Sequence, residues 1–495
     1  MSRRSLATAL VGIGALAIAG LALSAWVDPL VTDGGSTGAV ATAGHVLLAL
    51  AGVGVAIILL RVDPAWALSF GVAAAIFNGN WDLAGSPVPF DRLLIGLGVL
   101  ALLLRARRVE DVLGGAPRPV HWMLLLVSVY ALFSAVFSGT LDSQTARYGL
   151  VDQLGFVPFV LFAIGPAVYN DERRRRILLG TLTVVGAYLA YTSILGHLGP
   201  RSLVFPNYIV DPSVGIHADR ARGPFVAAAG DGLALFECAV AAVLLAVTAG
   251  ERWVRRSGIA VALACGLSIE LTLTRSVWIA SAAGLLVALL ATRQTRRYLV
   301  PVVAAAVIAV FGALAVIPGF QSEAENRVND DKPVWDRQNI NGAALRMIEA
   351  RPLLGFGWGT FQRNNAGYQR LAADHPITRA DLDEHNVFLA RAVELGLPTT
   401  AVWILALVLA VGSACLSKRG PPDLFGWRVG LVAIAAQWLV VANTVPLAFA
   451  FPNALLWLWA GIAFGPRQAA VTARETAPGT PPAPAPAPMR PQPAV

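Results

Sequence analysis

The sequence predicts an all-α, polytopic membrane helix bundle of about 14 spans with one large outer helical loop. Of its 495 residues, 56% are hydrophobic and only 14% are charged, whereas soluble globular chains carry about 25% charged residues. Apolar stretches of about 20 residues recur along the chain, which is the length a helix needs to cross the hydrocarbon core. No ten-residue alternating pattern indicates a barrel, and helices satisfy their own backbone groups in lipid.

The spans follow from sliding a window along the chain. The first apolar run follows Arg3 and Arg4; it is longer than the apolar part of a signal peptide, so we interpret it as a spanning helix. In chain order we expect spans at residues 6–27, 39–60, 65–81, 92–104, 119–138, 149–169, 177–197, 225–248, 257–272, 276–292, 299–318, 397–416, 427–446 and 449–465.

The basic residues predict the orientation of these spans. If the N-terminus is inside, every strong basic cluster falls on the same side, as the positive-inside rule requires. Both termini are then cytoplasmic, and membrane orientation explains the net charge of +8 better than nucleic-acid binding does. The inside clusters are Arg61; Arg105, Arg107 and Arg108; Arg173 to Arg176; Arg252, Arg255 and Arg256; Arg293, Arg296 and Arg297; Lys418 and Arg419; and Arg467.

This topology divides the chain into four regions. Residues 1–318 form an N-terminal membrane bundle, residues 319–396 an outer loop on the periplasmic side, and residues 397–466 the C-terminal membrane helices. Residues 467–495 are rich in Pro and Ala, so we expect a disordered cytoplasmic tail. A shorter outer segment covers about residues 199–223, and long loops of membrane proteins often carry function.

The outer loop combines helical patterning with a glycine-rich turn. Residues 340–348 place apolar side chains at helical spacing, and the helix should end at Arg351-Pro352, because a residue before proline avoids the α region. The glycines of residues 355–359 follow. A second helix is expected near Asp381, where Asp381-Leu382-Asp383-Glu384 resembles a capping box.

Three ordered pieces of this loop resemble the O-antigen ligase and polymerase family of bacterial membrane glycosyltransferases. They are Arg351-Pro352-Leu353-Leu354-Gly355-Phe356-Gly357, the His385-Asn386 pair, and Leu395-Gly396 entering the next span. Two further stretches support the resemblance: Thr274-Arg275-Ser276, and Arg220-Ala221-Arg222-Gly223-Pro224-Phe225. The chain departs from the family after Phe225, where Val226-Ala227-Ala228-Ala229 replaces the usual Pro-Asn pair.

The resemblance implies a site for a glycan linked to a polyprenyl diphosphate. It assigns His385 as the catalytic base or a close contact of the reacting centre, and Arg275 with Arg220 or Arg222 as the groups that hold the diphosphate; spacing to Gly223 favours Arg220. Arg351, Gly355, Gly357 and Asn386 are its supporting residues. Guanidinium groups bind phosphate oxygens bidentately, so we expect no metal and no cofactor. The expected partners are the lipid-linked donor, a glycan or lipid-glycan acceptor, and membrane lipid, with no nucleic acid.

Simpler interpretations of these residues exist. Arg275 at the end of a span can extend to lipid headgroups, and a histidine near a helix start is often solvated. A helix start favours the neutral imidazole, whereas Asp383 and Glu384 favour the charged one, and the sequence does not decide between them.

Two other functions compete with the glycosyltransferase. A flippase for lipid-linked oligosaccharide also has many spans, but such transporters often show repeated halves, and this chain has no evident repeat. A scaffold that recruits partners through the Pro-rich tail leaves the Arg and His pattern unexplained.

Overall fold

The computed structural model describes residues 63–86, 88–316, 322, 332–370, 376–377 and 383–465, and within these residues all regular structure is helical. The longer helices are α3 (Pro64–Ala74), α4 (Phe90–Arg105), α6 (Pro119–Phe137), α8 (Phe156–Val168), α9 (Glu172–Leu198), α10 (Ala228–Thr248), α11 (Arg252–Leu271), α12 (Arg275–Ala291), α14 (Leu299–Val316), α16 (Lys332–Ala350), α18 (Val387–Leu407), α20 (Leu424–Ala442) and α21 (Ala450–Phe464). The short elements are η1 (Ala75–Phe77), α5 (Val109–Leu113), α7 (Gln144–Tyr148), η2 (Gly149–Leu154), η3 (Arg201–Leu203), η4 (Asn207–Val210), η5 (Gly223–Phe225), α13 (Arg293–Arg296), α17 (Phe361–Asn365), η6 (Ala366–Tyr368), η7 (Val408–Gly412) and α19 (Ser413–Leu416).

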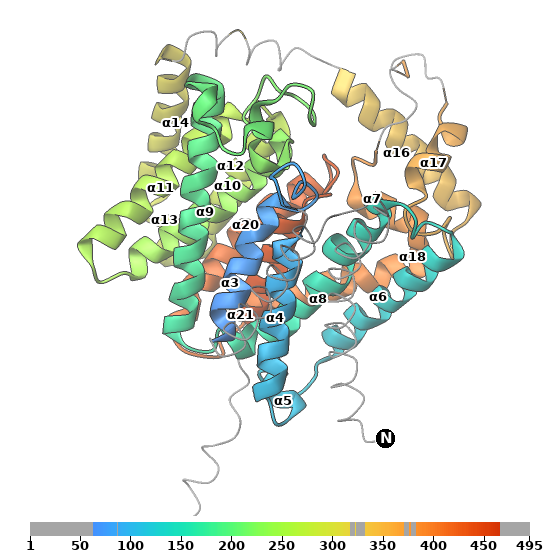
Figure 1. Ribbon diagram of the computed structural model, residues 1–495, viewed down its shortest axis with the longest axis horizontal. Coiled ribbons are helices and arrows are strands. Elements are labelled where there is room, and N and C mark those ends of the chain that lie inside the picture. Colours follow the sequence, from blue (N-terminus) through green and yellow to red (C-terminus); the bar gives the residue numbers. More distant parts are fainter. Residues whose placement is uncertain are drawn as a thin grey trace, which may run out of the picture.

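The core of the bundle is built around α21. Its side chains from Ala450 to Ala463 are all buried, as expected for a helix that is apolar on every face. α21 packs on α8, α10 and α20, and α20 packs in turn on α12. In Figure 1, α20 and α21 lie between α9 to α14 on one side and α6 and α16 to α18 on the other. The two groups are therefore joined through the C-terminal helices.

The predicted spans agree with helices wherever the structure describes them. Within the described part of the chain, six helical segments are long and apolar enough to cross a membrane, and Pro64–Phe77, Arg275–Ala291 and Ala450–Phe464 are shorter apolar helices. Every predicted span from residue 65 onward coincides with a helix, while the first two predicted spans lie outside the described residues. Large apolar side chains such as Phe137, Leu416 and Val300 are exposed on helix surfaces. The chain is thus a multi-pass membrane protein, and the count of about 14 spans stays a prediction.

The expected outer loop contains the predicted helix and a broken one. α16 ends at Ala350, immediately before Arg351-Pro352, as predicted. α18 begins at Val387 and continues to Leu407, with a break at Gly396, whose backbone is not helical. It therefore crosses the expected boundary between residues 396 and 397. Asp381, the expected start of a helix, lies outside the described residues.

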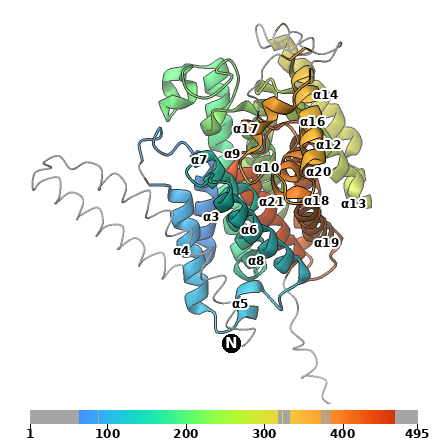
Figure 2. The same cartoon turned by 90° about the vertical axis from the view of Figure 1, so that its right-hand side faces the viewer.

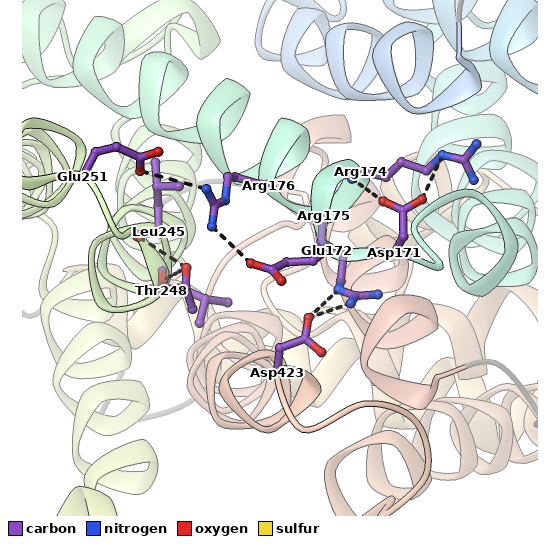
Figure 3. A network of polar contacts seen from close by, with 10 residues as sticks. Asp171, Glu172, Arg174, Arg175, Arg176, Leu245, Thr248, Glu251 and Asp423 are labelled. Atoms are coloured by element: carbon purple, nitrogen blue, oxygen red, sulfur yellow. Dashed lines mark hydrogen bonds and ion pairs between the residues drawn. The ribbon is translucent and has the colours of Figure 1, made fainter.

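Salt bridges at one end of the bundle join several segments that were predicted to lie on the cytoplasmic side. Arg175 at the start of α9 binds Asp423 at 2.6 Å, and Arg174 binds Asp63 at 2.7 Å. Arg176 contacts Glu172 and Glu251 (Figure 3). The segments before α3, α9, α11 and α20 thus meet at one end, which we call the Arg175 end. α5 lies at the lower end in Figures 1 and 2, and the segment before α10 lies at the upper end.

Candidate functional site

The candidate residues lie at the opposite end of the bundle, which we call the His385 end. His385 and Asn386 precede α18, and Arg275 is the first residue of α12. Arg220 and Arg222 lie in the segment between η4 and η5. Three parts of the chain far apart in sequence therefore supply these side chains.

His385 is half-buried and is held by its own loop. Its Nδ1 lies 2.9 Å from the backbone carbonyl of Asp383. Because a carbonyl oxygen only accepts hydrogen bonds, Nδ1 carries the proton of the neutral ring, and Nε2 keeps a free lone pair. The loop geometry thus selects the tautomer that a general base requires.

Burial lowers the pKa of His385 below its ordinary value, and the positive charge of Arg337 acts in the same direction. The hydrogen bond to the Asp383 carbonyl and the carboxylates of Asp336 and Asp383 oppose this shift without cancelling it. The balance that the sequence left open therefore favours the neutral imidazole. The neighbouring Glu384 is also half-buried, and burial raises its pKa to about 7 despite the charge of Arg391.

Asn386 has two structural contacts. Its Oδ1 accepts hydrogen bonds from the backbone N–H groups of Phe388 and Leu389, at 3.0 and 3.1 Å, and so caps the start of α18. Its Nδ2 donates to Oδ1 of Asn443, 3.1 Å away at the end of α20. The His385 loop is therefore fixed both to its own helix and to a distant one.

Arg337 on α16 is a candidate residue that the sequence analysis missed. Its Nε donates to the carbonyl of Thr444 at 3.1 Å, next to the Asn443 that binds Asn386. The pKa of Arg337 is lowered by burial and by the nearby positive charge of Arg275. Charge interactions therefore connect Arg275 to Arg337 and Arg337 to His385.

A sequence signal for Arg337 exists. It precedes Ile340 by three positions and Ala344 by seven, so it lies on the face of α16 that buries Ile340, Ala344 and Met347. A charged residue on the buried face of an amphipathic helix needs a partner or a function.

The turn between α11 and α12 presents Arg275. Leu273 adopts a positive φ of 47°, and the hydroxyl of Thr274 donates to the carbonyl of Thr272 at 2.8 Å. The backbone N–H of Ala221 donates to the carbonyl of Leu271 at 3.0 Å. The segment that carries Arg220 therefore lies directly against the turn that carries Arg275.

Arg220 and Arg222 have different surroundings. Arg222 is 2% exposed, and its guanidinium donates to the backbone carbonyls of Ile209, Val214 and Asp211. These hydrogen bonds hold residues 209–222, the segment before η5, in a closed loop. Both arginines line a small hollow together with Thr192 and Gly196 of α9, but the three carbonyls already occupy the guanidinium of Arg222. The geometry therefore gives Arg222 a bracing role and leaves Arg220 as the better candidate for binding.

The glycine-rich block fills the break in α18. Phe356 and Gly357 donate their backbone N–H groups to the carbonyls of Val393 and Glu394, at 2.8 and 3.0 Å, and Leu397 donates to Pro352 at 2.8 Å. The carbonyls of Val393 and Glu394 and the N–H of Leu397 lie on either side of the break at Gly396. The glycine-rich block therefore supplies the hydrogen-bond partners that the interrupted helix lacks.

Close packing requires glycine in this block. Gly355 and Gly357 both have positive φ, and a Cβ at Gly357 would overlap Oγ of Ser138, the residue that follows α6. Arg351 is exposed and stacks its guanidinium on the ring of Phe356, 4.7 Å from the centroid. The contacts of Arg351, Gly355 and Gly357 thus support the loop.

This fold and site define a multi-pass membrane protein, helical throughout its described elements, with guanidinium groups and an imidazole gathered at one end. The family model for O-antigen ligase matches residues 259–404. This match confirms the resemblance to the O-antigen ligase family that was found in the sequence, for the segment that it covers. Together with the apolar helices, it indicates a multi-pass protein of the inner membrane. The matched range contains Arg275, Arg337, Arg351, His385 and Asn386. No curated protein matches the chain.

Proposed function

We propose that this protein transfers a glycan from a polyprenyl diphosphate carrier to an acceptor hydroxyl at the outer face of the cytoplasmic membrane, as an O-antigen ligase or a polysaccharide polymerase does. One observation carries the proposal: the adjacent Asn443 and Thr444 bind Asn386 and Arg337, which brings a cation beside His385. The O-antigen ligase match over residues 259–404 supports it.

The chemical step is a single displacement. The acceptor hydroxyl oxygen attacks the anomeric carbon while the bond from that carbon to the diphosphate oxygen breaks, and the electron pair leaves with the diphosphate. Nε2 of His385 accepts the hydroxyl proton. Attack from the side opposite the leaving group inverts the anomeric configuration. The donor lipid lies in the bilayer, and the acceptor approaches from the aqueous side.

The arginines stabilise the departing diphosphate. Charge develops on its oxygens as the bond breaks, and preorganised guanidinium groups bind that charge without reorganisation. We assign this role to Arg275, Arg337 and Arg220, with Arg222 bracing the segment that carries Arg220. Because these side chains supply the positive charge, transfer should continue in EDTA; a rate lost in EDTA and restored by Mg²⁺ would contradict this part of the proposal.

The test uses purified full-length protein in lipid vesicles with a polyprenyl-diphosphate-linked glycan and an acceptor glycan. We expect free polyprenyl diphosphate to accumulate, and the mass of the product distinguishes addition to the acceptor from lengthening of the donor glycan. Movement of the donor across the vesicle membrane with no new glycosidic bond would overturn the proposal and favour a flippase.

A further inference from the structure

The turn between α20 and α21, residues 443–449, contacts three separate parts of the candidate site. Asn443 Oδ1 accepts from Asn386 Nδ2 at 3.1 Å, and the Thr444 carbonyl accepts from Arg337 Nε at 3.1 Å. The ring of Phe449 packs edge-to-face on Phe225, with centroids 6.1 Å apart. The turn thus touches the His-Asn pair, α16, and the motif that follows Arg220.

This turn is itself held firmly by the helices on both sides of it. Asn443 Nδ2 donates to the Leu439 carbonyl at 2.8 Å on α20. On α21, the buried Asn453 donates to the carbonyls of Leu447 and Phe449, at 3.0 and 2.9 Å, and accepts from Nε1 of Trp438. The turn is therefore a fixed platform, set by the most deeply buried helix of the bundle.

The hydrogen bond between Asn443 and Asn386 sets the orientation of the His385 loop. Oδ1 of Asn386 is already used to cap α18, so the Asn386 amide can reach outward only through Nδ2, and Nδ2 donates to Asn443. Asn443 therefore fixes the second end of that amide. His385 is the next residue in the chain, and its backbone follows any rotation of Asn386.

We propose that Asn443 is a positioning residue for glycan transfer, acting through Asn386 to hold His385 in line with the arginines. The inference rests on the proposed function. It adds a residue outside the segment 259–404 that matches the O-antigen ligase family. A loose base samples fewer productive geometries, and a misplacement of about 1 Å can lower a rate by about 100-fold.

The experiment compares Asn443→Ala with a matched control, Asn170→Ala. Asn170 accepts a 3.0 Å hydrogen bond from Arg174 at the Arg175 end, so each change removes one exposed amide and one hydrogen bond between two side chains. Asn443→Ala also removes the bond from Asn443 to the Leu439 carbonyl of its own helix. With the vesicle assay we expect Asn443→Ala to lower kcat about 10-fold and to leave KM for the donor within about two-fold. Asn170→Ala should leave both parameters unchanged.

A second variant breaks the same contact from the other side. Asn386→Ser keeps an oxygen that caps α18 but is too short to reach Asn443. We expect Asn386→Ser to lower kcat by a similar factor, and the double variant with Asn443→Ala to be no slower than the slower single variant, since both remove one interaction.

The outcomes separate this inference from the proposed function. If Asn443→Ala transfers glycan as fast as Asn170→Ala, or if the two losses multiply in the double variant, Asn443 has no positioning role. The same conclusion follows if Asn443→Ala lowers only the thermal midpoint. If the unmodified protein forms no glycosidic bond, the proposed function fails instead.

Discussion

At the Arg175 end of the bundle, Arg174, Arg175 and Arg176 bind carboxylates, whereas at the His385 end Arg222 and Arg337 donate to backbone carbonyls. The first group pairs with Asp63, Asp423 and Glu172, at 2.7, 2.6 and 3.1 Å. The second group binds the carbonyls of Thr444 and of the segment before η5. Arg174 to Arg176 thus have ionic partners and Arg222 and Arg337 have neutral ones, although Arg220 at the His385 end lies 3.9 Å from the carboxylate of Asp219.

This difference has an electrostatic consequence. A carboxylate cancels the charge of a guanidinium, so the pair stabilises the packing of helices and produces little field. A carbonyl orients the guanidinium by its dipole and leaves the net positive charge in place. Arg337 and Arg222 therefore keep a positive charge at the His385 end that can attract an anion, whereas Arg174 to Arg176 are suited to join helices.

The largest expected effect tests the site at the His385 end. His385→Ala should lower glycan transfer by about 10²- to 10⁴-fold, because a positioned general base contributes roughly that factor. The side chain is half-buried and donates to the Asp383 carbonyl of its own loop, so the thermal midpoint should hardly change. Release of polyprenyl diphosphate in vesicles measures the rate. Full activity in this variant would remove His385 from the mechanism.

The second-largest effect is expected at Arg337, with Arg346 as its control. Both arginines lie on α16, and each donates to a backbone carbonyl. Arg337 donates through Nε to Thr444, and Arg346 donates through Nε to the carbonyl of Tyr368 at 2.6 Å. Arg337→Ala should lower kcat/KM about 10- to 100-fold, since hydrogen bonds to charged groups contribute about 1.5–3 kcal/mol. Arg346→Ala should change kcat/KM by less than about three-fold. Equal losses in both variants would show that Arg337 serves only to hold α16.

The third prediction concerns the Arg175 end alone. Asp423→Ala leaves Arg175, which is 3% exposed, without its carboxylate and should lower the free energy of unfolding by about 1–3 kcal/mol. Asp423 is itself partly exposed, so solvent limits the loss. Thermal unfolding in lipid measures the change, and kcat per folded molecule should stay the same. A fall in kcat at full stability would show that the two ends are coupled.

The smallest effect concerns pH. Because burial and Arg337 lower the pKa of His385, the imidazole stays neutral until the pH falls below its ordinary value of about 6.5. Transfer should therefore lose activity only below that pH. Asp336 raises this pKa, so Asp336→Asn should move the acidic limb of the rate profile to lower pH.

Glu384 provides the control for this assignment, because its pKa is about 7. The acidic limb of kcat/KM should persist in Glu384→Gln. A limb that disappears in that variant would assign the titration to Glu384 and not to His385.

The sequence by itself determined the class of the protein and the place of its helices. The length of an apolar run and the end of a helix before Pro352 depend only on residues that are close in sequence. For this reason α16 and every described span were predictable from local pattern. The basic clusters also identified segments that meet at one end, as the bonds of Arg174 to Asp63 and of Arg175 to Asp423 confirm. The ordered motifs around Arg275 and His385 were sufficient to recognise the O-antigen ligase-like family.

Only the tertiary structure decided which partner each arginine and amide has. Arg337 binds Thr444, 107 positions away, and Arg175 binds Asp423, 248 positions away. The contacts of Arg222 with three carbonyls distinguish it from Arg220, although both fit the same motif. Periodicity describes one helix at a time, whereas these contacts depend on how helices from distant parts of the chain pack, and that packing sets where charge is cancelled and where it remains.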